Sequence, residues 1–374
     1  MQQKRLGDIA SYINGFAFKP EQRGKVGLPI IRIQDLTGNA YDLGFYDGDY
    51  PKKVEIDNGD VLISWSASLG VYEWNRGKAL LNQHIFKVVF DKLTVDKKFF
   101  MYAVQYKLGE MESKTHGATM KHITKKDFDN TTIPFPIISE QKTISDTLGK
   151  LYAIIADKRL QLEKLDDLVK ARFVEMFGND KYKTRTIKDV LCESFWLMPA
   201  TPKYIEKGIP YITSKNIKNR ILDLNDTKYI SEDDYLRISK NRPVKPGDIL
   251  VSMIGTLGQT AVVPKDKRFY GQNVYLLRLN GDIVNTPFFC EFFNSDDVQY
   301  KLTGKSNQST QAYLKANHVE ELSIPIPPIA IQNEFANLVA QVDKSKFALS
   351  NELTMCNFYI RLIHDRVMHG RINL

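Results

Sequence analysis

Two pairs of polar side chains stand at matching places in the two halves of the chain, each just beyond a short apolar run that begins with Gly-x-Pro. Arg32 and Gln34 follow the first run, and Lys215 and Asn216 follow the second. Arginine, lysine, glutamine and asparagine are the side chains that hydrogen-bond the edges of DNA bases, often through two bonds at once. These four residues are candidate DNA contacts, and a solvated strand end is the alternative interpretation.

A second polar cluster precedes a proline-rich junction in each half of the chain. It mixes lysines with short amide, hydroxyl and imidazole side chains, which suits phosphate contact combined with groove readout. The candidate DNA-binding residues in these clusters are Lys121, His122, Lys125 and Lys126 in the first half, and Lys305, Asn307, Gln308, Gln311 and Lys315 in the second. The two copies differ here, as readers of two different sequences should, and an ordinary polar loop is the alternative.

Catalytic and metal chemistry leave no recognisable signature in the sequence. There is no Gly-x-Gly-type loop between a strand and a helix, and no Asn-Pro-Pro-aromatic motif of the kind that holds a flipped base. The six histidines form no His-Glu-x-x-His pattern and lie near no paired cysteines. We therefore expect a chain without enzymatic activity, bound cofactor or metal.

The cysteines and the lack of apolar segments indicate a compartment. Cys192, Cys290 and Cys356 are widely separated and odd in number, which fits buried thiols in a reducing environment better than a disulfide framework. The amino-terminal segment carries no apolar stretch typical of a signal peptide, and no window is apolar enough for a membrane span. We expect a cytoplasmic protein.

The chain of 374 residues repeats itself. Gly59–Ser64 (GDVLIS) returns as Gly247–Ser252 (GDILVS), and further short matches keep the same order while their offset rises from 181 to 192 residues. A tandem duplication with a few loop insertions produces such a drift, whereas chance recurrence would not preserve the order.

Each copy changes its hydrophobic period part-way along. Short apolar runs bounded by Gly, Pro, Asn and Asp predict strands first, with one aromatic-rich helix among them. A proline-free segment of about 40 residues with alternating steps of three and four follows, which predicts one long helix. The expected fold class is α+β, with two pseudo-equivalent α/β globules separated by two long antiparallel helices that form a coiled coil. The predicted domains are residues 1–138, 139–178, 179–329 and 330–374.

The apolar stripes of the two helices should cover each other, because an isolated helix of roughly 60 Å is unstable in water unless its stripe is buried. The predicted seam consists of Ile144, Leu148, Leu151, Ile155, Leu162, Leu165 and Val169 in the first helix, and Phe335, Leu338, Val342, Leu349, Leu353, Ile360 and Ile363 in the second.

The net positive charge of the chain lies in the globules. Lysine and arginine number 52 against 44 acids, a formal excess of eight. Residues 139–178 hold seven basic and seven acidic side chains, and residues 330–370 hold four of each, so the whole excess lies outside the helices. This division favours globules that meet a polyanion and helices that meet protein.

Taken together, these features resemble the specificity subunits of type I restriction–modification enzymes. The resemblance covers essentially the whole chain and depends on the duplicated order of degenerate motifs. They are Gly59–Ser64 and Gly247–Ser252, with Gly70 and Gly258 after them; the Ile133–Pro136 and Ile324–Pro327 junctions, with Gln141 and Gln332; and the long helix that closes each half.

The resemblance implies partners as well as a fold. It implies two target recognition domains, each reading one half of a split double-stranded DNA site, and helices that set the gap between the half-sites. It also implies two docked methyltransferase subunits and further restriction and translocase subunits, with S-adenosylmethionine, ATP and Mg on those partners and no catalytic residue in this chain. The alternatives are a self-contained DNA methyltransferase or endonuclease with an unrecognised motif, and a duplicated scaffold that binds only proteins.

Overall fold

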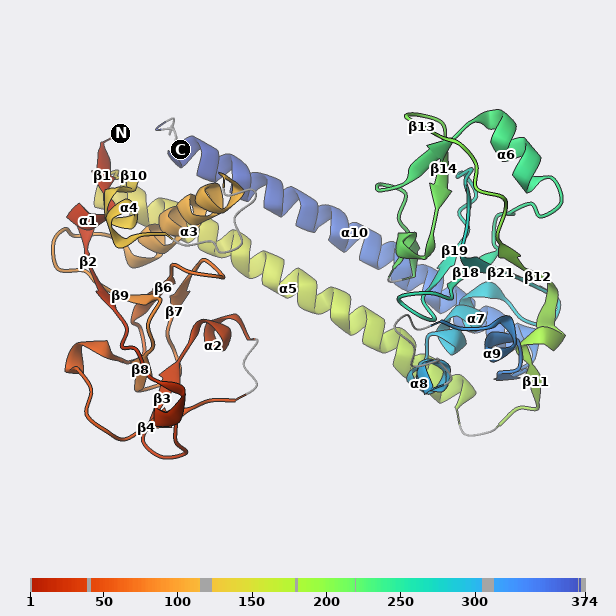
Figure 1. The fold of residues 1–374 in the computed structure, drawn as a ribbon, viewed down its shortest axis with the longest axis horizontal. Helices are drawn as coiled ribbons and strands as arrows, with labels where there is room; N and C mark the ends of the chain where they lie inside the picture. Colours follow the sequence, from red (N-terminus) through yellow and green to blue (C-terminus); the bar gives the residue numbers. More distant parts are fainter. Residues whose placement is uncertain are drawn as a thin grey trace. The chain divides into compact units, whose positions relative to one another are not determined.

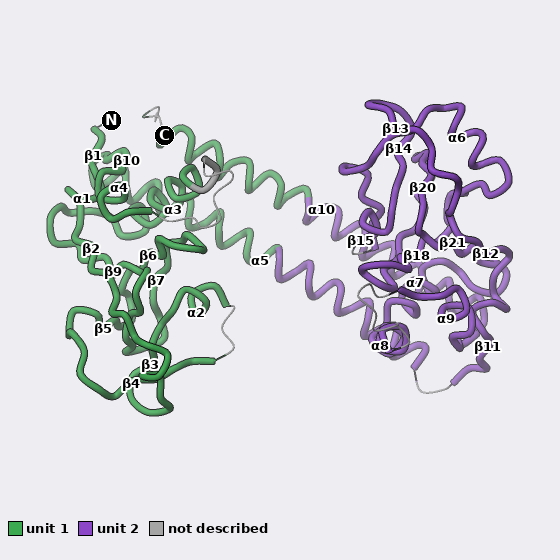
Figure 2. Tube along the Cα trace, in the orientation of Figure 1, with its two compact units in different colours: residues 1–158, 351–374 green, residues 159–350 purple. Residues whose placement is uncertain are grey.

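The structure is a computed structural model that describes residues 2–38, 42–114, 123–178, 181–218, 220–304, 313–368 and 370 (Figure 1). The chain divides into two compact units, and both long helices pass from one unit to the other part-way along (Figure 2). Unit 1 is Met1–Lys158 with Asn351–Leu374, and unit 2 is Arg159–Ser350. These two units divide the chain differently from the four predicted segments. The four segments therefore stay a prediction of domain organisation.

Unit 1 is built on two four-stranded sheets. The first has the order β2 (Ser11–Asn14), β9 (Ile85–Val89), β6 (Val61–Ser64), β7 (Gly70–Glu73), and all its pairings are antiparallel. The second has the order β4 (Phe45–Tyr46), β3 (Leu28–Ile31), β8 (Ala79–Leu81), β5 (Glu55–Ile56), with β3 and β8 parallel. Every residue of β6 is buried, because this strand has a hydrophobic cluster on each face. That explains its unbroken apolar run.

Unit 2 repeats this design. Its antiparallel sheet has the order β12 (Leu191–Leu197), β21 (Val274–Leu279), β18 (Ile249–Ser252), β19 (Thr260–Val262). Its second sheet has the order β13 (Tyr204–Ile205), β17 (Lys228–Ile230), β14 (Ile209–Ile212), β20 (Tyr270–Gly271), again with one parallel pair. The predicted fold class, two equivalent mixed globules with two long helices, is confirmed.

Short elements complete each unit. Two-stranded ribbons join β1 (Gln3–Arg5) to β10 (Thr132–Pro134) and β11 (Thr184–Thr186) to β22 (Ser323–Pro325), which brings the start of each globule to its proline-rich end. Unit 2 also has the hairpin β15 (Ile217–Lys218) and β16 (Ile221–Leu222). The short helices are α1 (Leu6–Ile9), α2 (Ile33–Thr37), α4 (Lys125–Asn130), α6 (Glu232–Ser239), α8 (Asp296–Gly304) and α9 (Ala316–Glu320).

One aromatic-rich helix covers the antiparallel sheet in each unit. It is α3 (Lys97–Lys114) in unit 1 and α7 (Thr286–Phe293) in unit 2. An acceptor side chain begins each helix: Asp96 accepts from the amide of Phe99, and Asn285 accepts from the amide of Phe288. Such caps satisfy amides that the first turn leaves without an intrahelical partner.

The long helices α5 (Ile138–Phe177) and α10 (Ile329–Met368) are paired antiparallel inside each unit. In unit 1 the beginning of α5 packs with the end of α10, and in unit 2 the end of α5 packs with the beginning of α10. Ion pairs follow the same order: Lys158 contacts Glu352 in unit 1, and Asp166 contacts Lys346 at 2.5 Å in unit 2. No helix in the described part of the chain is both long and apolar enough to cross a bilayer.

The three cysteines are free thiols. Cys290 and Cys356 are partly buried, but Cys192 is exposed, so the expectation of burial was wrong for Cys192. Cys192 lies on β12 at a register shift between Leu191 and Glu193, where the regular alternation of the strand is interrupted and Cys192 and Glu193 are both exposed.

A histidine near the end of α10 is partly buried against α3. The His364 ring makes an edge-to-face contact with Tyr106, with centroids 5.2 Å apart, and the Tyr106 hydroxyl donates to Asp365 at 2.8 Å. Burial lowers the pKa of His364, and the Asp365 carboxylate opposes that shift only in part. The folded chain therefore favours the neutral imidazole.

This burial predicts a loss of stability in acid. Below the unperturbed histidine pKa of about 6.5, the unfolded chain binds a proton that the folded chain disfavours, so the free energy of unfolding should fall as the pH drops. Urea unfolding at about pH 7.5 and about pH 5.5, on either side of that value, measures the effect. In the His364→Gln variant, the free energy of unfolding should differ less between the two pH values than it does in the wild-type protein. An unchanged difference would assign the acid sensitivity to other groups.

Candidate nucleic-acid interface

In each second sheet, a buried acceptor closes the turn after the first strand of the parallel pair, which is β3 in unit 1 and β14 in unit 2. Asp35 accepts a hydrogen bond from the Arg32 amide at 2.8 Å, and Asn216 accepts one from the Thr213 amide at 2.9 Å. Both acceptors are nearly inaccessible, with exposed fractions of 6% and 3%. The two copies thus share one turn geometry after β3 and β14, whichever side chains surround it.

This geometry involves two of the predicted DNA contacts. The Asn216 amide group donates to the backbone oxygens of Asp223 and Asp226, both at 3.0 Å, so all its hydrogen-bonding groups are used inside the protein. The Arg32 guanidinium contacts Asp35 at 3.1 Å and donates to the backbone oxygen of Asp42. Both side chains hold the turn, with Asn216 buried and Arg32 partly buried, so their predicted contact with DNA stays untested and is not carried into the proposal below.

Their neighbours Gln34 and Lys215 are exposed at equivalent positions. Lys215 contacts Asp226 at 3.1 Å, but the two side chains are 60% and 90% exposed. An ion pair between exposed groups contributes little stability and is easily exchanged for another anion. Gln34 and Lys215 therefore stay predicted DNA contacts.

The polar clusters enter the two globules in the same way. The amide of Ile123 donates to the Trp65 oxygen at 3.1 Å, and the amide of Leu314 donates to the Met253 oxygen at 2.8 Å. Trp65 and Met253 are the residues that directly follow β6 and β18. Ile123 and Leu314 are thus held at the same end of the antiparallel sheet in the two units.

Three predicted lysines lie beside these entry points. Lys125 and Lys126 begin α4, and Lys315 immediately precedes α9; all three are exposed. Lys125 contacts Asp129 at 2.7 Å, again as a pair at the surface. The remaining predicted contacts, Lys121, His122, Lys305, Asn307, Gln308 and Gln311, lie outside the described residues.

A buried glutamine ties each long helix to its globule. The Gln141 side chain donates to the Pro136 oxygen at 2.8 Å and accepts from the Asp96 amide at 2.8 Å. Gln332 does the same with the Pro327 oxygen at 2.8 Å and the Asn285 amide at 3.0 Å. The repetition of this glutamine was visible in the sequence, but its role as a joint between α5 or α10 and the capped helix of the globule was not.

The predicted seam residues divide between the two units. In unit 1, Ile144, Leu148, Ile155 and Ile360 are buried, and Leu151, Leu353 and Ile363 pack against them. In unit 2, Val169, Phe335 and Val342 are buried, with Leu165 beside them, while Leu162, Leu338 and Leu349 are partly exposed. The α3 helix shares in burying Ile144 and Leu148, which line a small apolar cavity together with its Phe99 and Ala103.

The helix pair also carries an open apolar groove in unit 2. Its volume is about 670 Å³, and its apolar wall is formed by Leu165, Leu168, Ala348 and Leu349. Leu168 is 48% exposed. In unit 1, Met355 and Phe358 of α10 are 56% and 62% exposed, one helical turn apart. Exposed apolar side chains of this size on a helix pair are typical of protein docking surfaces.

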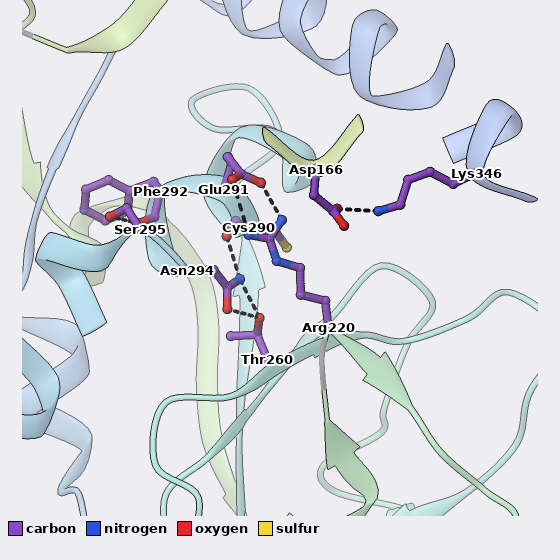
Figure 3. Close-up of polar contacts among 9 residues, drawn as sticks. All are labelled: Asp166, Arg220, Thr260, Cys290, Glu291, Phe292, Asn294, Ser295 and Lys346. Atoms are coloured by element: carbon purple, nitrogen blue, oxygen red, sulfur yellow. Dashed lines mark hydrogen bonds and ion pairs between the residues drawn. The ribbon is translucent and has the colours of Figure 1, made fainter. Parts of the chain in front are cut away.

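Sequence reasoning missed a latch in unit 2, drawn in Figure 3. Arg220 has a left-handed φ of 65° in the turn of the β15–β16 hairpin, and its guanidinium contacts both carboxylate oxygens of Glu291 on α7, at 2.5 and 3.2 Å. Glu291 is buried, and burial also raises the pKa of the neighbouring Cys290 to about 12. Seventy-one positions separate the two partners, so no local sequence pattern could have paired them.

No group of three or more metal-ligating side chains occurs among the residues that the structure describes.

The sequence profile of the type I restriction modification DNA specificity domain matches the chain twice, over residues 1–164 and 179–355. The chain belongs to this family.

Curated relatives carry the same description. The chain is 25% identical over 414 residues to the specificity subunit of the type I restriction enzyme EcoBI from Escherichia coli, covering 98% of this chain and 85% of that protein. It is 20% identical to the EcoKI specificity subunit from Escherichia coli strain K12, covering 98% and 88%.

Solved structures share the fold. The S subunit of a type I restriction-modification system from M. genitalium superimposes with a TM-score of 0.59 at 15% identity, covering 98% of this chain and 96% of that one. A chain from a study of complex assembly in the type I R-M system gives 0.55 at 16% identity, covering 99% and 98%.

The glutamine joint yields a stability prediction. Gln141→Leu should lower the free energy of unfolding of this protein by roughly 2 to 5 kcal/mol, because it leaves the Asp96 amide and the Pro136 oxygen buried without partners. Gln341→Leu, at an exposed position of α10, is the control and should change stability by less than about 0.5 kcal/mol. Chemical unfolding of the two variants checks this, and equal effects would remove the joint's structural role.

Proposed function

We propose that this chain is the sequence-recognition subunit of a type I restriction–modification complex, in which each unit reads one half of a bipartite site in double-stranded DNA. The carrying observation is the duplicated scaffold, with equivalent turns and equivalent entry points for two polar segments of different sequence. Shared backbone with divergent polar side chains is what two half-site readers require. Family membership and the names of the relatives support the same function.

The residues proposed to contact DNA are the exposed and undescribed members of the predicted set. They are Gln34, Lys121, His122, Lys125, Lys126, Lys215, Lys305, Asn307, Gln308, Gln311 and Lys315. The excess of eight positive charges lies outside the helices and would attract DNA non-specifically.

The proposal assigns catalysis to partner subunits. Two methyltransferase subunits, carrying S-adenosylmethionine, would dock on the exposed apolar positions of the helix pair, one in each unit. Restriction and translocase subunits, which use ATP and Mg, would join them. This chain would work in the cytoplasm and supply recognition without chemistry of its own.

The docking proposal predicts the composition of the complex. The wild-type chain should co-purify with two methyltransferase subunits and show no methylation or cleavage on its own. Leu168→Asp places a charge in the unit 2 groove and should reduce the complex to one methyltransferase, and Phe358→Asp should do the same through unit 1. Native mass measurement checks this. Two methyltransferases retained by both variants would place docking elsewhere.

The reading proposal separates base contacts from phosphate contacts. Asn307→Ala with Gln311→Ala should relax only one half-site, at a cost of about 1 to 3 kcal/mol per lost base contact. Lys315→Ala should weaken binding to every sequence and lower the salt slope of affinity by about one phosphate contact. Lys344→Ala, on the exposed surface of α10, is the matched control and should leave the slope unchanged. A slope that is insensitive to Lys315→Ala would remove this lysine from the interface.

The helices are proposed to set the distance between half-sites. Leu349 lies about one turn beyond Lys346 and Leu162 one turn before Asp166, so heptads inserted after Leu162 and after Leu349 should stay opposite each other. Each insertion lengthens its helix by about 10 Å, and we expect the preferred spacer to grow by about 1 to 3 base pairs. Selection from DNA libraries with variable spacers measures this. An unchanged spacing optimum in a folded, DNA-binding variant would mean that the helices are not the ruler.

A further inference from the structure

One end of the antiparallel sheet in unit 1 carries a compact group of polar and aromatic side chains. Trp65 donates from its indole nitrogen to the Asn14 side-chain oxygen at 3.3 Å. Its ring also meets the His84 ring, with centroids 5.0 Å apart, and stacks on Phe86. Asn14 is exposed, and Trp65 and His84 are partly exposed. These side chains come from the ends of β2 and β6 and from the turn before β9.

Unit 2 has the same backbone positions with different side chains. Trp196 pairs with Tyr275 as Asn14 pairs with Phe86, so Trp196 is the counterpart of Asn14. Asn273 is the counterpart of His84, because Asn273 lies two residues before Tyr275 and His84 lies two residues before Phe86. Met253 stands where unit 1 has Trp65, but Met253 is completely buried.

The turn residue at this end is left-handed in both copies. His84 has a φ of 73° and Asn273 has a φ of 61°, although neither is glycine. Non-glycine residues seldom adopt this conformation, and asparagine and histidine are among the few types that tolerate it. Both copies therefore keep an unfavourable backbone geometry together with a polar side chain, where glycine would relieve the strain.

This sheet end is also where the polar clusters enter. The Trp65 amide donates to the His84 oxygen at 3.3 Å, and the Trp65 oxygen accepts from the amide of Ile123, which lies within the first polar cluster. In unit 2, the Met253 oxygen accepts from Leu314, and Asn273 borders the pairing of Val274 with Ser252. The turn residues thus lie one strand away from Ile123 and Leu314, the residues of the two polar clusters that these bonds place.

From this arrangement we propose that the sheet end reads bases directly and helps to set the sequence preference of each unit. The reading side chains are Asn14, Trp65 and His84 in unit 1, and Trp196 and Asn273 in unit 2. The inference rests on the proposed DNA-reading function and adds residues that lie outside the polar clusters.

The side-chain chemistry differs between the copies in the way that two half-sites demand. An asparagine amide matches the adenine edge, and an imidazole can both donate and accept. An indole face offers apolar or stacking contact to a base. Unit 1 places the amide on β2 and the imidazole in the turn, whereas unit 2 places the indole on β12 and the amide in the turn. The two units share these backbone positions, but different types of side chain occupy them.

Exchanging the two turn residues tests the proposal with little backbone disturbance. The variants are His84→Asn and Asn273→His, since both residue types accept a left-handed φ. His84→Gly is a further variant that keeps the backbone geometry and removes the side chain. Asn75→His is the matched control, because it follows Trp74, whose amide bonds to Asp60 at the opposite end of β6. Each full-length chain, in complex with its methyltransferase partners, is used to select sites from a randomised DNA library, and thermal unfolding confirms folding.

The expected result is a change at one half-site in each variant. His84→Asn and His84→Gly should alter base preference by roughly fivefold or more at positions read by unit 1 alone, and Asn273→His should do so at positions read by unit 2 alone. Asn75→His should select the wild-type site. Folded turn variants that all select the wild-type site would overturn the inference and leave the proposed function intact. A wild-type complex that selects no sequence would overturn the proposed function and the inference with it.

Discussion

The buried amide of one glutamine in each unit joins the parts on which recognition depends. Gln141 and Gln332 each link the peptide just before a long helix to the capping residue of the helix that covers the sheet. A buried backbone group without a partner is costly, so the hydrogen bonds favour one orientation of helix on globule. Any function that uses the helices to place the recognition surfaces needs this joint.

Around the joint, buried polar groups hold the loops in equivalent shapes. Ser64 and Ser252 are completely buried, and their hydroxyls donate to backbone oxygens of the following loops, at Ser68 and Thr256. Asp35 and Asn216 do the corresponding work in the other turn. Sequence differences are thereby carried by the exposed positions, so preference for DNA can change without a change of fold.

The two copies also solve the same electrostatic problem differently. Asp60 and Asp248 precede equivalent central strands and accept equivalent backbone hydrogen bonds, from Asp57 and Lys245. Their cations come from different places, since Lys87 contacts Asp60 in unit 1 and Arg278 contacts Asp248 in unit 2. The aspartate closes the turn in both units, and the neighbouring strand of the sheet supplies its cation from a different position in each unit.

Local periodicity determined much of this protein before any coordinates were known. Alternation and the heptad steps are properties of neighbouring residues, so strands such as Val61–Ser64, both long helices and the duplication could be read directly. Residue type at a strand end does not say which way a side chain points, and only tertiary packing buried Asn216 and drew Arg32 into its turn. The same holds for partners far apart in the chain: the Arg220–Glu291 latch, and the division of each long helix between two cores, arise from burial that no local pattern encodes.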